Sequence, residues 1–345
     1  MTTISTQIQL AARPKGEPTV ENFQTAEVTL PELQDGEILV RIIYLSLDPY
    51  MRGRMNDAKS YAQPVEVGEV MGAGTVGQVM QSRNPKFAEG DFVLGMFGWQ
   101  SHAISDGQMV RKLDRADAPI STAVGVLGMP GLTAYVGLMD IGEPKEGETV
   151  VVSAASGAVG SVVGQLAKIK GCHVVGVAGS VEKCAYVRDE LGFDVCLSHR
   201  SETLAEDMAD ACPKGVDVYY ENVGGVSFNA VLPLMNPFGR IPVCGLISQY
   251  NATALPDGPD TGPAIFRSVL TNRLKIQGFI VTDRYERLGA FTKEVGAYIR
   301  DGRLKYREDI VEGLENAPDA FIGLLNGENF GKMLIQVSED PSRDG

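Results

Sequence analysis

Apolar runs that alternate with helical segments from residue 149 onward constrain the fold of this chain most strongly. The run TVVVSAA at 149–155 predicts a buried strand, and the following AVGSVVGQLAKIKG predicts a helix. HVVGVAG and DVCLS repeat this order, each with a helical segment after it, and VDVYYENV, RIPVCGLI and LKIQGFIV predict three more strands. Strands separated by helices pair in parallel, so the pattern predicts a doubly wound α/β sheet.

The first third of the chain predicts a different architecture, rich in β-structure. EILVRIIYLS begins as an apolar strand that breaks at Pro49, and EVMGAGTVGQVMQS combines β-forming residues with Gly72, Gly74 and Gly77. Glycines inside strands favour bends, so we expect a small, curved, barrel-like sheet over 1–125. The tail ends in another β-like run, for which we predict a return to this first domain.

Composition excludes several classes of function. The formal net charge is −13 and no dense Lys/Arg stripe is present, so nucleic acid is not an expected partner. No apolar run reaches the ~20 residues that a membrane span needs, and the first residues lack the pattern of an export signal. The five cysteines form no CxxC pair, which predicts reduced thiols in a cytoplasmic protein: Cys172, Cys184, Cys196, Cys212 and Cys244.

The turn between the first strand and helix of the α/β region carries a candidate dinucleotide site. Ala155, Gly157 and Gly160 stand at positions i, i+2 and i+5, the dinucleotide glycine pattern with alanine in its first position. Gly157 would let the backbone approach a pyrophosphate, and Gly160 would let the helix pack closely on the strand. We therefore predict a cofactor turn at Gly157, Ala158, Val159 and Gly160. The alternative is a close strand–helix contact without a ligand.

The end of the second strand distinguishes NADP from NAD. An NAD site usually places Asp or Glu ~20 residues after the glycines, where it binds the ribose hydroxyls. Here the strand ends in Gly179 and Ser180 with Lys183 close behind, and His199 and Arg200 follow the third strand. Positive or potentially positive groups without the acid favour NADPH, with these residues beside its 2′-phosphate. The alternative for each of them is an ordinary solvated surface residue.

Residues able to bind a metal or to act as a nucleophile are sparse. The three histidines, His102, His173 and His199, do not cluster with cysteines, so we expect no metal site. No GxSxG elbow is present. Tyr50 follows a predicted strand, and Tyr250 follows the fifth strand of the α/β region, at the sheet edge where ligands bind. We select both as candidate catalytic residues. The alternative is that each ring packs against apolar neighbours while its hydroxyl contacts water.

Several longer motifs together point to a known family. The motifs YLSLDPYMRGRM, GMPGLTAYVGLMDIG, AASGAVGSVVGQLAKIKGC, VVGVAGSVEK, YYENVGG, GRIPVCGLISQYN and NFGK resemble the zinc-independent medium-chain dehydrogenase/reductases. Within that family they are similar to the group of prostaglandin reductases, plant alkenal double-bond reductases and bacterial NADPH-dependent curcumin reductases. The similarity extends over nearly the whole chain.

The resemblance implies an architecture and a set of cofactor contacts. A GroES-like catalytic domain would comprise 1–125 and 306–345, a Rossmann NADP-binding domain would comprise 126–305, and the protein would be a homodimer. Lys183 would contact the 2′-phosphate, and His199 stands where many members have a tyrosine. Tyr50 and Tyr250 match tyrosines that flank the substrate. Positions near the nicotinamide half or the pyrophosphate are matched by Asn222, Cys244, Phe279, Val281 and Asn329.

For the reaction, the resemblance implies reduction of a C=C bond conjugated to a carbonyl, in enones of the curcumin type and in alkenals. Hydride adds to the β-carbon, and the enolate oxygen takes a hydrogen bond from Tyr250 or from the nicotinamide ribose. A tyrosine or water then protonates the α-carbon. Two alternatives stay open: a quinone reductase of the same superfamily, and a non-catalytic NADPH-binding redox sensor. Loops 56–66 and 250–265, which the sequence does not position, are expected to shape the pocket.

Overall fold

The computed structural model describes residues 3–115, 118–254 and 260–342, which form two compact units. One unit comprises Met1–Gly128 and Glu308–Gly345, and the other comprises Met129–Arg307. Both boundaries lie slightly later than the predicted 125/126 and 305/306, because a helix begins at Met129 and a strand begins at Glu308. Residues 255–259 of the predicted pocket loop 250–265 lie outside the described residues.

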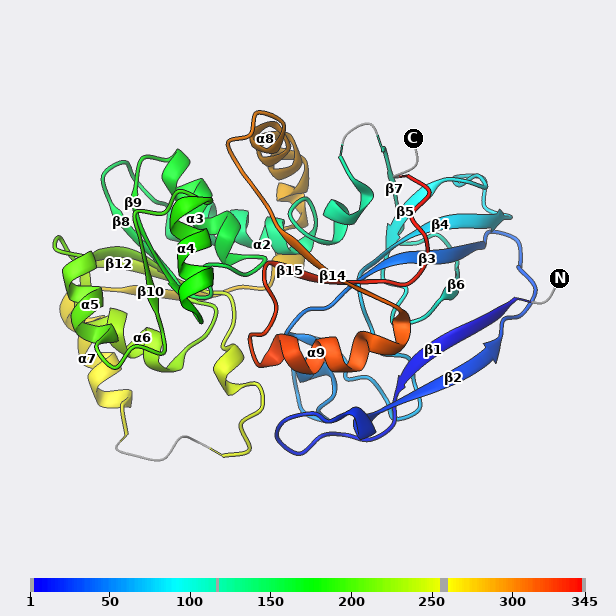
Figure 1. The fold of residues 1–345 in the computed structure, drawn as a ribbon, viewed down its shortest axis with the longest axis horizontal. Coiled ribbons are helices and arrows are strands. Elements are labelled where there is room, and N and C mark those ends of the chain that lie inside the picture. The colour runs from blue at the N-terminus through cyan, green and yellow to red at the C-terminus, as the bar shows by residue number, and fades with distance from the viewer. Residues whose placement is uncertain (1–2, 116–117, 255–259, 343–345) are drawn as a thin grey trace. The chain divides into compact units, whose positions relative to one another are not determined.

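The first unit is built mainly from antiparallel strands (Figure 1). Its larger sheet has the order β14-β15-β3-β4-β5-β7, with β6 also paired to β3, while β1 and β2 form a separate pair. The strands are β1 (Ile4–Leu10), β2 (Phe23–Thr29), β3 (Ile38–Ser46), β4 (Thr75–Ser82), β5 (Phe92–Gly95), β6 (His102–Ser105), β7 (Arg111–Leu113), β14 (Glu308–Glu312) and β15 (Lys332–Gln336). The helices described in this unit include α1 (Met51–Arg54) and α9 (Ala317–Leu325).

The strand β3 forms from the apolar run predicted for it. All of its residues except Arg41 are buried, and it ends before Pro49, which cannot donate a ladder hydrogen bond. Gly77 lies in β4, where an added Cβ would come within 2.5 Å of the Arg41 carbonyl oxygen. This close approach requires glycine. Gly72 and Gly74 do not bend the strand as predicted, because β4 begins only at Thr75.

The tail of the chain completes the apolar core of the first unit. The rings of Phe23 and Trp99 stack with their centroids 5.6 Å apart, and Phe321 from α9 meets Trp99 edge-on at 5.7 Å. The strand β15 pairs with β3 in the large sheet. Buried aromatic contacts of this kind contribute strongly to stability, so residues after Glu308 fold as part of this unit.

The second unit contains a six-stranded parallel sheet with the order β10-β9-β8-β11-β12-β13. Its strands are β8 (Thr149–Val152), β9 (His173–Ala178), β10 (Val195–Ser198), β11 (Val216–Tyr220), β12 (Met235–Val243) and β13 (Lys275–Gly278). Its helices include α2 (Met129–Val136), α3 (Gly160–Ile169), α4 (Val181–Asp189), α5 (Leu204–Ala211), α6 (Gly225–Val231), α7 (Gly262–Asn272) and α8 (Leu288–Arg300). This order is that of a Rossmann fold, with the first strand at the centre.

Helices cover both faces of this parallel sheet (Figure 1). One face packs against α5, α6 and α7 through a core that includes Val151, Val175 and Tyr219 from the strands. The helices α3 and α4 lie over the opposite face (Figure 1). The central strands β8 and β9 are buried on both sides, which is why their sequences are nearly continuous apolar runs, whereas the edge strand β13 is mostly exposed.

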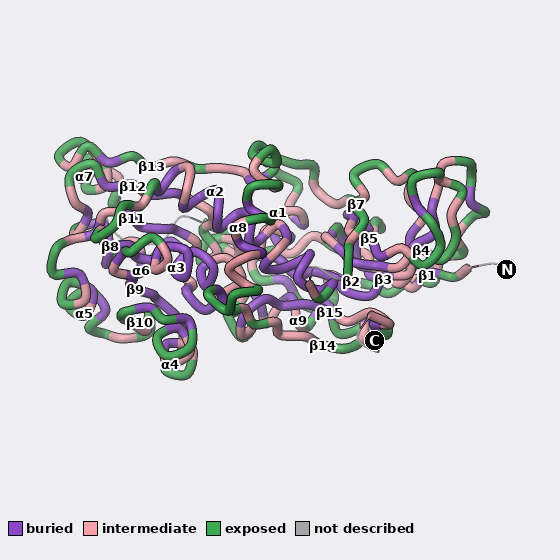
Figure 2. The backbone as a smooth tube through the Cα atoms, turned by 90° about the horizontal axis from the view of Figure 1, so that it is seen from above, coloured by how far each residue is buried: buried purple, intermediate pink, exposed green. Residues whose placement is uncertain are grey.

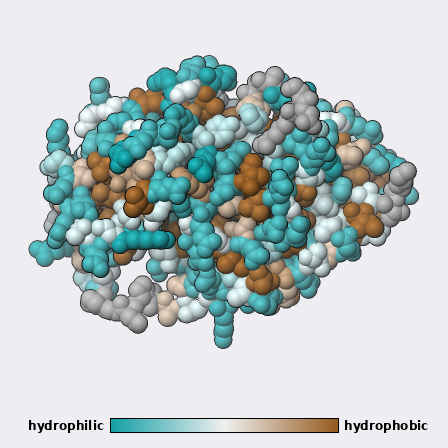
Figure 3. All heavy atoms as spheres, in the orientation of Figure 1, coloured by the Kyte–Doolittle hydropathy of each residue, from teal (hydrophilic) through white to brown (hydrophobic). Residues whose placement is uncertain are grey.

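The surface is mostly polar where it is exposed. On the face drawn in Figure 3, hydrophilic residues surround separate hydrophobic patches. Within the described part of the chain, no helix combines the length and apolarity needed to cross a bilayer.

Candidate functional site

The carboxyl ends of β8 and β11 meet where the strand order of the parallel sheet reverses. The strands β9 and β10 lie on one side of β8, and β11, β12 and β13 lie on the other (Figure 2). In open parallel sheets, ligands bind outside the carboxyl ends of the strands at such a switch point. The segments that follow β8, β9, β11 and β12 therefore build the candidate cofactor site.

A buried carboxylate, Glu221, organises the ends of the two central strands. The residue is 1% exposed, and its Oε1 accepts hydrogen bonds from Ser153 Oγ at 2.9 Å and from the N–H groups of Val223 and Gly224 at 2.7 and 2.9 Å. Asn222 donates its backbone N–H to Ser153 Oγ and its side-chain Nδ2 to the Ser153 carbonyl oxygen, both at 2.8 Å. The predicted residue Asn222 is thus fixed between the strands.

Neither Glu221 nor Ser153 was among the site residues predicted from the sequence. The available signal was a charged residue directly after a buried apolar strand, which is unusual unless the charge has several hydrogen-bond donors around it. The three donors on Glu221 supply that environment.

The glycine turn lies between β8 and α3. A Cβ at Gly160 would stand 2.3 Å from the Ala154 carbonyl oxygen, so only glycine fits where the helix begins. Gly157, Ala158 and Val159 precede it and remain partly exposed. The first N–H groups of a helix have no intrahelical partners, and together with the helix dipole they favour a bound anion. The four predicted turn residues therefore form a cradle suited to a pyrophosphate.

The residues predicted to contact the 2′-phosphate gather after β9 and β10. Ser180 is the N-cap of α4, and its Oγ accepts the N–H of Lys183 at 3.2 Å. The His199 ring lies against Gly179, where an added Cβ would be 3.2 Å from Nε2. Burial lowers the pKa of His199, and the nearby charges of Arg200 and Lys183 lower it further. These effects favour the uncharged imidazole in the free protein, and contact of His199 with the 2′-phosphate stays a prediction.

Two residues predicted near the nicotinamide half surround Tyr220. The Tyr220 hydroxyl donates to the Thr133 carbonyl oxygen at 2.8 Å and also interacts with the Cys244 thiol. Burial raises the pKa of Cys244 to about 12, so this thiol is a neutral group and not a nucleophile. At Gly137, an added Cβ would lie 2.5 Å from the Tyr220 hydroxyl oxygen and 2.7 Å from Cζ of Phe279. The absence of a side chain there leaves room for both Tyr220 and Phe279 against the backbone at this position.

Tyr250 and Val281 follow the last two strands of the sheet. Tyr250 comes after a 3-10 turn at Ile247–Gln249, and the Leu246 N–H donates to its hydroxyl oxygen at 3.4 Å. A phenolic hydroxyl can accept one hydrogen bond and still donate its own hydrogen. A donated hydrogen bond is what stabilises an oxyanion. Val281 is buried at the start of the segment after β13.

Two predicted residues, Tyr50 and Asn329, belong to the first unit, whereas the other candidates belong to the second. Tyr50 directly precedes α1, and the Arg54 guanidinium lies 5.7 Å from its ring centroid and 4.3 Å from that of Tyr61. Asn329 donates its Nδ2 to the Gly331 carbonyl oxygen at 2.8 Å, in the turn before β15. Arg54 and Tyr61 extend the aromatic and cationic surface beside Tyr50, and neither was among the site residues predicted from the sequence.

Models of two known domain families match this chain. The N-terminal domain of oxidoreductases matches residues 6–113, and the zinc-binding dehydrogenase domain matches residues 158–294. Over residues 3–115, 118–254 and 260–342, no group of three or more His, Cys, Asp or Glu side chains is arranged to hold a metal ion.

Similarity to individual proteins covers nearly the full length. NADPH-dependent curcumin reductase of Escherichia coli is 54% identical over 96% of this chain and 96% of its own length. Prostaglandin reductase 1 of Rattus norvegicus is 45% identical over 94% of this chain and 96% of its own length. The crystal structure of CurA in complex with NADPH from Vibrio vulnificus has 54% identity and a TM-score of 0.94, covering 97% of this chain and 100% of that one. With a β-rich N-terminal domain, a Rossmann sheet and these relatives, the chain belongs to the medium-chain dehydrogenase/reductase family.

Proposed function

We propose that this protein is an NADPH-dependent reductase of the C=C bond in α,β-unsaturated ketones and aldehydes. The observation that carries the proposal is 54% identity to an NADPH-dependent curcumin reductase over 96% of both chains. The site supports it, because its candidate residues can hold a dinucleotide and present hydroxyl donors, which is what enone reduction needs.

The residues of the second unit fit NADPH. The helix α3 begins so close to the strand before it that a Cβ at Gly160 would strike the Ala154 carbonyl oxygen. The turn residues before Gly160 are partly exposed, so a pyrophosphate could reach the helix N-terminus. Lys183 and Arg200 would hold the 2′-phosphate, with Ser180 beside them. Asn222, Cys244, Phe279 and Val281 would lie near the nicotinamide half or the pyrophosphate, and we propose the same for Asn329 of the first unit. The chemistry supplied by bound NADPH is hydride donation, which an enone accepts at its β-carbon.

Tyr250 is the proposed group that acts on the substrate. As negative charge develops on the carbonyl oxygen, its phenolic O–H would donate a hydrogen bond to that oxygen. Tyr50 would flank the substrate and orient it. The α-carbon then takes a proton from a tyrosine or from water, so the chain needs no carboxylate base.

The direct test is turnover with NADPH. We expect purified protein to oxidise NADPH in the presence of curcumin, 2-alkenals and alkenones, and deuterium from labelled NADPH should appear on the β-carbon by mass spectrometry. Quinones serve as the comparison substrates. Faster reduction of quinones than of every enone would assign the protein to quinone reduction, and tight NADPH binding without turnover of any substrate would assign it to cofactor sensing.

We propose that the reaction does not depend on zinc, although the match to the second domain model bears a zinc-binding description. The proposal is supported by the tyrosine-based chemistry above, which polarises the carbonyl without a Lewis acid. Dialysis against a strong chelator should leave kcat unchanged. One zinc ion per chain that is needed for turnover would refute this part of the proposal.

We also propose that the protein is a homodimer in the cytoplasm. The strand β13 is an edge of the parallel sheet, and Phe266 and Leu270 on the neighbouring α7 are 75% and 78% exposed. Figure 2 shows exposed stretches in α7, and no residue of that helix is buried. An unpaired edge beside exposed apolar side chains suits a second copy of the chain. Leu270→Glu should shift the molecular mass in sedimentation toward the monomer. All five cysteines are free thiols, which supports a reducing compartment.

A further inference from the structure

The first unit contains a buried lysine that the proposed mechanism does not use. Lys332, the first residue of β15, is 4% exposed. Its Nζ lies 2.6 Å from the Leu47 carbonyl oxygen and 3.0 Å from Oδ1 of Asp48, which is itself 6% exposed. The other carboxylate oxygen of Asp48 accepts a hydrogen bond from Ser46 Oγ. A buried ion pair of this kind adds little net stability, because desolvation offsets the attraction, so its value lies in what it holds in place.

On one side, the ion pair holds the segment that carries Tyr50. This segment joins the end of β3 to α1, and Leu47 and Asp48 are its first residues. Backbone hydrogen bonds then run from Met51 N–H to the Asp48 carbonyl oxygen and from Gly53 N–H to the Tyr50 carbonyl oxygen, both at 3.0 Å. The position of Asp48 therefore sets where this turn begins, and Tyr50 is two residues further along.

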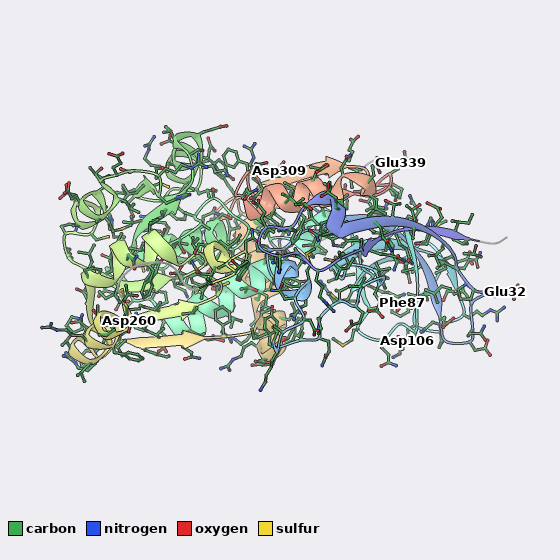
Figure 4. The ribbon with its side chains drawn as sticks, turned by 90° about the horizontal axis from the view of Figure 1, so that it is seen from below. Glu32, Phe87, Asp106, Asp260, Asp309 and Glu339 are labelled. Carbon is green, nitrogen blue, oxygen red and sulfur yellow. The ribbon has the colours of Figure 1, made fainter. Side chains whose placement is uncertain are left out.

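On the other side, the lysine ends the turn that carries Asn329. The Asn329 side chain donates to the Gly331 carbonyl oxygen, directly before Lys332. The Phe330 N–H donates to Oδ2 of Asp309 on β14 at 2.8 Å, and Asp309 is labelled in Figure 4. One ammonium group thus joins the two turns of the first unit that carry candidate site residues.

We propose that Lys332, paired with Asp48, is a positioning residue. It fixes the turn that carries Tyr50 relative to the turn that carries Asn329. Its effect on catalysis rests on the proposed function, in which Tyr50 flanks the enone. Lys332 itself touches neither substrate nor cofactor.

The test removes both charges together, because Lys332→Met alone leaves a buried Asp48 without its partner and can prevent folding. In the double variant Asp48→Asn/Lys332→Met, we expect the amides of residues 47–53 to exchange hydrogen roughly tenfold faster, the effect of losing one or two hydrogen bonds. The matched control is Glu148→Gln/Arg240→Met, which removes a partly buried ion pair of the second unit and should leave exchange at 47–53 unchanged. Unchanged exchange at 47–53 in a folded Asp48→Asn/Lys332→Met protein would overturn the proposal.

Kinetics then separate positioning from general stability. We expect Asp48→Asn/Lys332→Met to lower kcat/KM for the enone roughly ten- to a hundredfold, because small misplacements of orienting groups are costly. In a Tyr50→Ala background the same double change should lower kcat/KM for the enone less than it does in the unmodified protein, because only the contribution through the Asn329 turn remains. An additive loss in that background would show that Lys332 does not act through Tyr50. If the unmodified protein reduces no enone, the proposed function fails, and the exchange experiment still decides whether Lys332 positions the turn.

Discussion

The side chain of Asn222 donates a 2.8 Å hydrogen bond to the carbonyl oxygen of Ser153. Asn222 follows β11 and Ser153 follows β8, so this bond joins the two strands at the switch point of the Rossmann sheet. Both residues also depend on Glu221, whose carboxylate receives the Ser153 hydroxyl and the N–H groups of the next turn. The predicted cofactor residue is therefore held by a polar network that the parallel sheet itself creates.

Glu221→Ala should disturb this network. The change leaves the N–H groups of Val223 and Gly224 without their acceptor, and a buried unpaired donor costs about 1–3 kcal/mol. We expect lower stability in urea unfolding and weaker NADPH binding by calorimetry. Glu221→Gln is the control, since an amide oxygen can still accept these bonds and should restore most of the binding. Full NADPH affinity in a folded Glu221→Ala protein would show that the hydrogen-bond network around Glu221 does not contribute to NADPH binding.

Lys183→Ala should change the preference between the two nicotinamide cofactors. A charge-assisted hydrogen bond to phosphate contributes roughly 1.5–3 kcal/mol, so KM for NADPH should rise about ten- to a hundredfold. KM for NADH should barely change, because NADH has no 2′-phosphate. Initial rates with both cofactors test this expectation. Equal use of NADH and NADPH by the unmodified protein would show that Lys183 does not select for the 2′-phosphate.

Tyr250→Phe should lower kcat more than it raises KM for the enone. One oxyanion donor contributes ~2.7–4 kcal/mol, but a second donor can compensate, so we expect a loss of about ten- to a hundredfold in kcat. NADPH affinity should change little, because the ring remains.

Tyr50→Phe is the matched comparison, because a tyrosine that orients substrate by its ring tolerates loss of the hydroxyl. Full kcat in Tyr250→Phe together with a large loss in Tyr50→Phe would reverse the two roles. Full activity in both variants would show that neither tyrosine is catalytic and that water protonates the α-carbon.

Glu148→Gln should reduce stability in a pH-dependent way. Burial raises the pKa of Glu148, but hydrogen bonds from Arg240 outweigh this and hold the pKa below its usual 4.5. The stabilisation by the ionised carboxylate is therefore complete above that value and is lost as pH falls through the lower folded pKa. We expect the variant to lose about 1.5–3 kcal/mol at pH 7, and the difference should shrink toward pH 3. Urea unfolding across this range measures it, and a difference that grows on acidification would contradict the assignment.

The sequence by itself determined the fold class of this protein, because burial on both faces leaves a local signature. The central strand β8 is a continuous apolar run and β9 is nearly so, and the glycine at position 160 stands where strand and helix approach too closely for a side chain. The pattern missed α6 and α7 and began the strand β12 at Arg240 rather than Met235, but the six predicted strands correspond to β8 through β13. These features depend on neighbours in the chain, so a pattern of residues is enough to reveal them.

Only the tertiary structure decided which side chains hold the site together. Glu221 and Ser153 come from strands separated by two complete strand–helix units, and Lys332 reaches Asp48 across most of the chain. The lowered pKa of His199 follows from burial, from Arg200 next to it in the chain and from Lys183, which only the fold brings near. Hydrogen bonds and pKa values of buried groups depend on what lies within a few ångströms in space, and distance along the sequence does not report that.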